Sequence, residues 1–142
     1  MLLFLMRETI FLIEDEVELQ QNLKVILEYN GFSVLTADNG QDALLKIKNQ
    51  EVDLILCDIM MPVLDGYQFL EIIRNQERFQ HLPFIFLSAR ASEEDKSKGL
   101  QEGADDYLIK PIPARVLLNS IFGVLDKKKR EFEAFSKKES GF

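Results

Sequence analysis

Short apolar runs alternate with amphipathic stretches along most of the chain. The apolar runs are rich in Ile, Leu, Phe and Val and have the length of β-strands. They predict five strands, at residues 9–13, 32–36, 53–57, 84–87 and 107–109. Because their apolar residues are continuous rather than alternating with polar ones, we expect a sheet that is covered on both faces.

The stretches between these runs place apolar residues three and four positions apart, which is typical of helices that pack on a core. They predict helices at residues 16–29, 41–49 and 67–76, from 92 to about 103, and from Pro113 onward. Asp65 and Ser92 are expected to cap two of these helices, and Gly31 and Gly103 to end two. Strict alternation of strands and helices predicts an α/β fold of the flavodoxin-like, doubly wound type. Its five-stranded parallel sheet would have the order 2-1-3-4-5, with helices on both faces.

The composition favours a single globular domain. A chain of 142 residues that is 46% hydrophobic can bury a sizeable core, and its one cysteine, Cys57, excludes an intrachain disulfide and a Cys-based zinc site. Residues 127–142 contain six of the 17 basic and three of the 24 acidic residues, which leaves a net charge of −10 on the first 126. A domain so acidic repels a phosphate backbone, so we expect no direct binding to nucleic acid.

The sequence divides into three parts. Residues 1–6 are apolar but lack the basic start of a signal peptide, and we interpret them as an N-terminal extension. Residues 7–126 form the domain, and residues 127–142 form a charged C-terminal helical tail or linker. No apolar run approaches the roughly 18 residues of a membrane span, so we expect a cytoplasmic protein that does not enter the membrane.

Polar side chains follow four of the predicted strands. Glu14 and Asp15 follow the first strand, Asp58 the third, Ser88 the fourth and Lys110 the fifth. Parallel strands bring their carboxyl ends to one edge, where such sheets bind ligands. Clustered carboxylates repel one another unless a cation neutralises them, and oxygen ligands suit Mg²⁺. A carboxylate beside Mg²⁺ and a lysine can attack phosphorus and form an acyl phosphate. No glycine-rich phosphate-binding motif occurs, which argues against ATP as the donor.

Residues 7–126 resemble the receiver domain of two-component response regulators, in particular single receivers like the chemotaxis regulator. The resemblance rests on the acidic pair Glu14-Asp15, on Asp58-Ile59-Met60-Met61-Pro62-x-x-Asp65-Gly66, on Ser88-Ala89, and on Gly103-Ala104-Asp105-Asp106-Tyr107-Leu108-x-Lys110-Pro111. It implies that Asp58 accepts a phosphoryl group from a phosphohistidine. The donor would be a sensor histidine kinase or a His-phosphotransfer protein.

The resemblance also implies a role for each residue of the site. Asp15, Asp58 and the backbone carbonyl of Met60 would hold Mg²⁺, with Glu14 acting through water. Lys110 would pair with the phosphoryl group, and the Lys110–Pro111 peptide bond would be cis. Ser88 would swing in to hydrogen-bond the phosphoryl group while Tyr107 changes rotamer.

The expected function is that of a signalling switch, whose only reactions are its own phosphorylation and dephosphorylation. By the same resemblance, the output face would comprise the fourth helix, the fifth strand and the fifth helix, and its partner would be a downstream protein or a missing output domain. Met60 and Arg90 would set the lifetime of the phosphoryl group.

Two other functions compete with this interpretation. A phosphatase can also form an aspartyl phosphate on a similar sheet, but such enzymes carry a second Asp where this chain has Met60. An inactive adaptor, or pseudo-receiver, is the other alternative. Finally, Leu118, Phe122, Leu125, Phe132 and Phe135 form a heptad-like stripe that continues the last helix, which favours a homodimer or a contact with another partner over disorder.

Overall fold

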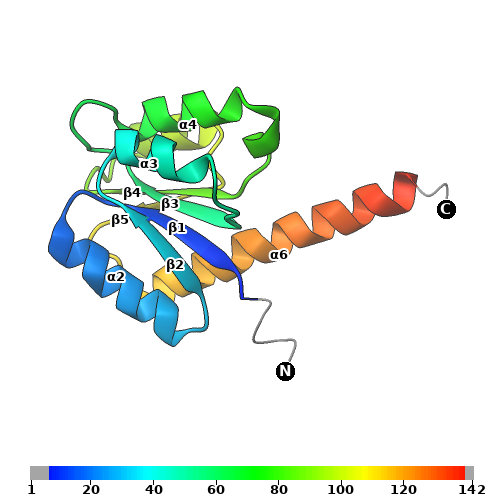
Figure 1. Cartoon of the computed structure of the whole chain (residues 1–142), viewed down its shortest axis with the longest axis horizontal. Helices are drawn as coiled ribbons and strands as arrows, with labels where there is room; N and C mark the ends of the chain where they lie inside the picture. The colour runs from blue at the N-terminus through cyan, green and yellow to red at the C-terminus, as the bar shows by residue number, and fades with distance from the viewer. Residues whose placement is uncertain (1–6, 140–142) are drawn as a thin grey trace.

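The described part of the chain folds into one five-stranded parallel sheet with helices on both faces (Figure 1). The computed structural model describes residues 7–139, so the predicted N-terminal extension lies outside the described residues. The strands are β1 (Thr9–Ile13), β2 (Ser33–Ala37), β3 (Leu54–Asp58), β4 (Phe84–Ser88) and β5 (Asp106–Ile109). Their order in the sheet is β2-β1-β3-β4-β5, which confirms the predicted doubly wound fold.

Within residues 7–139, five α-helices and one short 3₁₀ helix connect and cover the strands. The α-helices are α2 (Val17–Tyr29), α3 (Gly40–Ile47), α4 (Gly66–Arg74), α5 (Glu93–Gln101) and α6 (Ala114–Glu139). The 3₁₀ helix η1 (Glu77–Phe79), which the hydrophobic pattern did not predict, leads into β4. No helix in the described part of the chain is both long and apolar enough to span a bilayer.

Alternate residues of the strands supply two separate cores. Phe11 and Ile13 of β1 pack with α3 and α4 on one side of the sheet, whereas Ile10 and Leu12 pack with α2 and α6 on the other. Every residue of β3 and β4 is buried. The continuous apolar runs in the sequence therefore follow from helices on both faces of the sheet, as expected.

Two strands are shifted by one residue from their predicted bounds, and β4 and β5 are each one residue longer than predicted. β2 begins at Ser33 because Phe32 turns into the α2–α6 core, where its ring lies 5.6 Å from the ring of Phe122. β3 begins after Asp53, whose carboxylate accepts a hydrogen bond from the Thr9 amide at 2.7 Å. Since β3 also ends one residue later, Asp58 belongs to the strand itself.

The helix ends follow the signals in the sequence. Asp65 caps α4, and together with Gln68 it forms a reciprocal capping box. Ser92 caps α5 by accepting a hydrogen bond from the Asp95 amide. Gly31 and Gly103, which follow α2 and α5, have φ values of +93° and +111°, a region that favours glycine. The predicted caps at Asp65 and Ser92 and the helix ends before Gly31 and Gly103 are therefore confirmed, whereas the helices predicted at 41–49 and 67–76 end two residues earlier, at Ile47 and Arg74.

Candidate functional site

The parallel register brings the predicted polar residues to one edge of the sheet. Asp58 is the last residue of β3, and Ser88 is the last residue of β4. Glu14 and Asp15 come directly after β1, which pairs with β3, and Lys110 comes directly after β5, which pairs with β4. These polar residues therefore lie together at the carboxyl ends of the strands, as predicted.

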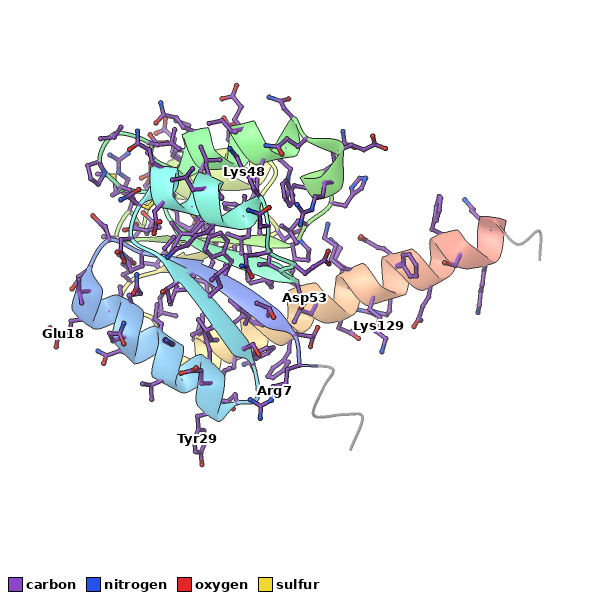
Figure 2. The ribbon with its side chains drawn as sticks, in the orientation of Figure 1. Arg7, Glu18, Tyr29, Lys48, Asp53 and Lys129 are labelled. Atoms are coloured by element: carbon purple, nitrogen blue, oxygen red, sulfur yellow. The ribbon has the colours of Figure 1, made fainter. Side chains whose placement is uncertain are left out.

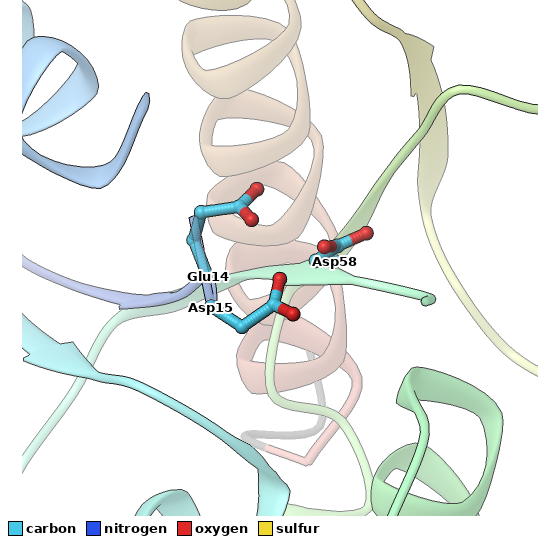
Figure 3. Close-up of side chains that lie close together, drawn as sticks. All are labelled: Glu14, Asp15 and Asp58. Atoms are coloured by element: carbon cyan, nitrogen blue, oxygen red, sulfur yellow. The ribbon is translucent and has the colours of Figure 1, made fainter. Parts of the chain in front are cut away.

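Three carboxylates form the centre of this site. Glu14, Asp15 and Asp58 each have an oxygen within 4.8 Å of the others, and Figure 3 shows Asp58 facing the acidic pair. Glu14 and Asp58 are buried, whereas Asp15 is exposed. The cluster therefore has two carboxylates in the protein interior and one that faces solvent.

Lys110 joins the two buried carboxylates. Its ammonium lies 2.8 Å from Oε1 of Glu14 and 3.2 Å from Oδ2 of Asp58. The backbone holds the lysine in place, because its amide donates to the carbonyl of Ser88 at 2.8 Å. The Lys110–Pro111 bond that follows is cis, as the resemblance implied.

Burial changes the protonation of this cluster. Desolvation raises the pKa of Glu14 to about 7, although Lys110 opposes the change. Desolvation also raises the pKa of Asp58 against the same opposing charge. For Lys110, burial lowers the pKa, but the hydrogen bond and attraction of Glu14 and the charge of Asp58 outweigh it, so its pKa is raised. One ammonium thus only partly compensates the buried carboxylates, and a cation would stabilise their charged forms.

A tight loop holds Asp58 and the residues after it. The amide of Met60 donates to Oδ1 of Asp58 at 3.1 Å, and the amide of Gly66 donates to the carbonyl of Ile59 at 2.9 Å. A Cβ at Gly66 would lie 2.5 Å from the Asp58 carbonyl oxygen, closer than real contacts allow. Only glycine permits this approach, so the first residue of α4 sits directly against the end of β3.

Ser88 and Tyr107 both contact the backbone of Arg90. The hydroxyl oxygen of Ser88, which is fully buried, accepts from the Arg90 amide at 3.0 Å. The hydroxyl of Tyr107 donates to the Arg90 carbonyl at 3.0 Å. Tyr107 is itself buried, and Gly99 leaves room for its ring, since a Cβ there would lie 2.8 Å from Cδ2 of Tyr107. In this structure the two residues are linked through one loop, and Tyr107 points inward.

A family model and related proteins agree with this geometry. Residues 10–122 match the response regulator receiver domain. The chain belongs to this receiver family. A crystallised CheY-like receiver from Methanospirillum hungatei JF-1 has a TM-score of 0.81 and 31% identity to it, with 88% of this chain and 98% of that one covered.

Curated relatives of this receiver differ in length. Transcriptional regulatory protein AfsQ1 of Streptomyces coelicolor is 40% identical over 123 residues, which cover 87% of this chain and 53% of AfsQ1. The chain thus spans about half the length of that relative. Protein PilG of Pseudomonas aeruginosa is 39% identical over 112 residues, which cover 79% of this chain and 83% of PilG.

The donor atoms of the receiver's acidic cluster fit a hard cation. All the side-chain donors are carboxylate oxygens, which Mg²⁺ and Ca²⁺ prefer over nitrogen or sulfur. Cys57 offers no competing ligand, because it is buried and its thiol donates to the Asp58 carbonyl. Asp65 is occupied as a helix cap, and Asp106 accepts hydrogen bonds from the Tyr107 amide and the Ser120 hydroxyl. Glu14, Asp15 and Asp58 could therefore hold the ion.

Sequence reasoning missed one residue that supports the receiver site. The buried side-chain amide of Gln20 donates to the carbonyls of Glu14 and Ala37 and to Oδ1 of Asp38. It thereby ties the loop after β1 to the end of β2. Gln20 lies three residues before Leu23 on the buried face of α2, so a polar residue at an apolar position was the signal that could have revealed it.

Proposed function

We propose that this receiver is a phosphorylation-activated switch in which Asp58 is the phosphoacceptor. The observation that carries the proposal is the position of Lys110, whose ammonium lies 3.2 Å from a buried Asp58 carboxylate at the ligand-binding edge of the sheet. A lysine there can stabilise negative charge on a phosphoryl group that Asp58 has accepted.

The proposed donor is a phosphohistidine on a sensor histidine kinase or a His-phosphotransfer protein. A carboxylate oxygen of Asp58 attacks the phosphorus, the P–N bond breaks, and its electron pair leaves with the imidazole. The product is an acyl phosphate on Asp58, while Lys110 pairs with its oxygens. Asp58 must be ionised to attack, and the nearby ammonium favours that form against burial.

Mg²⁺ is the proposed cofactor. Asp15, Asp58 and the backbone carbonyl of Met60 would hold it directly, and Glu14 would act through water. When bound, it neutralises charge on the carboxylates and on the phosphoryl oxygens. The three carboxylates within 4.8 Å of one another support this assignment.

The proposed switch connects Ser88 to Tyr107. Ser88 would leave the Arg90 amide and donate a hydrogen bond from its hydroxyl to a phosphoryl oxygen, which removes one anchor of the loop that also holds Tyr107. Tyr107 would then change rotamer and alter the surface formed by α5, β5 and α6. A downstream protein or an output domain would bind this surface, and we place this receiver in the cytoplasm.

Beryllofluoride, a mimic of the phosphoryl group, tests the proposal. With Mg²⁺ and beryllofluoride, the amide NMR spectrum should shift around residues 58, 88 and 107, and Asp58→Asn should abolish the shifts. Asp65→Asn is the matched control, because it makes the same chemical change at a helix cap where asparagine also serves. A wild-type spectrum that does not change, or an Asp58→Asn variant that responds like the control, contradicts the proposal.

A further inference from the structure

The last helix continues far past the domain that it covers. Leu117, Ile121 and Val124 of α6 are buried against the sheet, but the helix runs on to Glu139 (Figure 1). Phe132 and Phe135 in this extension are 70% and 60% exposed. Two phenyl rings in water on a single helix mark a surface that another apolar surface can cover.

The residues on one side of α6 follow a heptad pattern. Counting alternately four and three residues from Leu118 gives the seam positions Phe122, Leu125, Lys129, Phe132 and Ser136. In heptad notation, 122, 129 and 136 occupy position a, and 118, 125 and 132 occupy position d. Phe122 is half exposed, and it lines a hollow together with Leu125, Lys129, Asp126 and Glu8. Leu118 and Leu125 pack in part on the core between α2 and α6, and Phe122 packs on Phe32, so the seam is half-open where α6 leaves the domain.

We propose that this seam binds the same seam of a second copy of the chain, as a parallel two-stranded coiled coil. The charges beside the seam select this partner and this direction. In a parallel pair, position g of one helix faces position e of the next heptad on the other, which places Lys128 opposite Glu133 of the second copy. The two-fold axis repeats this pairing of opposite charges.

An antiparallel pair would place like charges together. Positions g then face g and positions e face e. One register would place Lys128 against Lys128 and Asp126 against Asp126, and the next register would place Asp126 against Glu133. Within its own domain, Nζ of Lys128 already lies 3.3 Å from Oδ1 of Asp105. An ammonium has three donors, so it can also pair with Glu133 of the second copy. Glu133 is exposed, so it is accessible to a partner helix.

Lys129 limits the strength of this dimer. It occupies a seam position, and Figure 2 shows it projecting from α6. A lysine at a single a position favours a defined oligomer at a cost in stability. The dimer should therefore be weak and depend on protein concentration, and replacing Lys129 by leucine should strengthen it.

Sedimentation of the whole chain over a range of concentrations tests the proposal. The wild type should pass from monomer to dimer as its concentration rises, Phe132→Glu should stay monomeric, and Lys129→Leu should dimerise at lower concentration. Leu45→Glu is the matched control, because Leu45 is 66% exposed on α3, away from the seam, and it should dimerise like the wild type. A wild type and a Lys129→Leu variant that both stay monomeric throughout overturn the proposal.

Two further variants test the direction of the helices. Glu133→Lys should weaken the dimer by roughly tenfold because two attractive pairs become repulsive, whereas Glu131→Lys, the same change at position c, should have little effect. Ser136→Cys at a seam position should form a disulfide-linked dimer on oxidation, and the buried Cys57 should not. A dimer that Ser136→Cys fails to cross-link overturns the parallel arrangement. None of these measurements depends on phosphorylation of Asp58.

Discussion

Val63 has a backbone conformation that a β-branched residue rarely adopts, and we predict that relieving it stabilises the protein. Its φ is +71°, in the left-handed region. The amide of Leu64 donates to the carbonyl of Pro62 at 2.8 Å, so Val63 is the central residue of a γ-turn. Its side chain is 82% exposed, which means that a substitution removes little packing.

The size of the effect follows from this geometry. A side chain in the left-handed region costs about 1–2 kcal/mol, and asparagine tolerates that region better than valine. Val63→Asn should therefore raise the free energy of unfolding by about 1 kcal/mol, which is roughly 0.5 M in the urea midpoint for a slope near 2 kcal/mol/M. Val63→Gly should gain less, because glycine increases the conformational entropy of the unfolded chain by an equivalent of about 0.4–1 kcal/mol.

Urea unfolding followed by circular dichroism measures these differences. Val25→Asn is the control, since Val25 is also a well-exposed valine but lies in the helical backbone of α2. Its free energy of unfolding should stay within about 0.5 kcal/mol of the wild type. If Val63→Asn unfolds at or below the wild-type midpoint with an unchanged slope, the turn stores no strain and the reasoning is refuted.

Three other predictions concern the site. Without metal, the free energy of unfolding should fall as pH rises from about 4.5 to about 7, because native Glu14 keeps a proton that the unfolded chain releases near 4.5. Urea unfolding at a series of pH values measures this, and in Glu14→Gln the free energy of unfolding should depend less on pH. Gly99→Ala should lower the urea midpoint, because its Cβ would lie 2.8 Å from the Tyr107 ring. Overpacking costs about 1–3 kcal/mol, whereas the gain in helix propensity is about 1 kcal/mol. A higher midpoint would contradict the close packing of Tyr107 against Gly99. Met60→Asn with Arg90→Glu should speed the decay of the phosphoprotein, since a polar side chain can orient the attacking water; radiolabel decay that is no faster than the parent's would exclude these positions.

The hydrophobic pattern predicted the fold well because both faces of the sheet are covered. Burial on both sides makes the strands continuous apolar runs, and the caps at Asp65 and Ser92 depend on local sequence. The boundaries of β2 and β3 were wrong by one residue, because a contact from another element decides each. Phe32 packs against Phe122, and the Asp53 carboxylate accepts a hydrogen bond from the Thr9 amide. Both contacts join residues that are far apart in the sequence.

The sequence also predicted which residues meet at the site, because parallel strands align their carboxyl ends. It could not predict the contacts among them. The short distance from Lys110 to Glu14 and the inward position of Tyr107 depend on side-chain packing, including the space that Gly99 leaves. The basic run 127–130 lies within α6, which is one helix from Ala114 to Glu139. Charged residues with long side chains favour a helix when they are solvated.

Chemical mapping identifies the phosphoacceptor. The protein is incubated with acetyl phosphate and Mg²⁺, the acyl phosphate is reduced with borohydride, and mass spectrometry locates the reduced residue among the peptides. Asp58 alone should be modified in the wild type, and no residue should be modified in Asp58→Asn. Modification of Glu14 or Asp15 in place of Asp58, or an unmodified protein, would contradict this prediction.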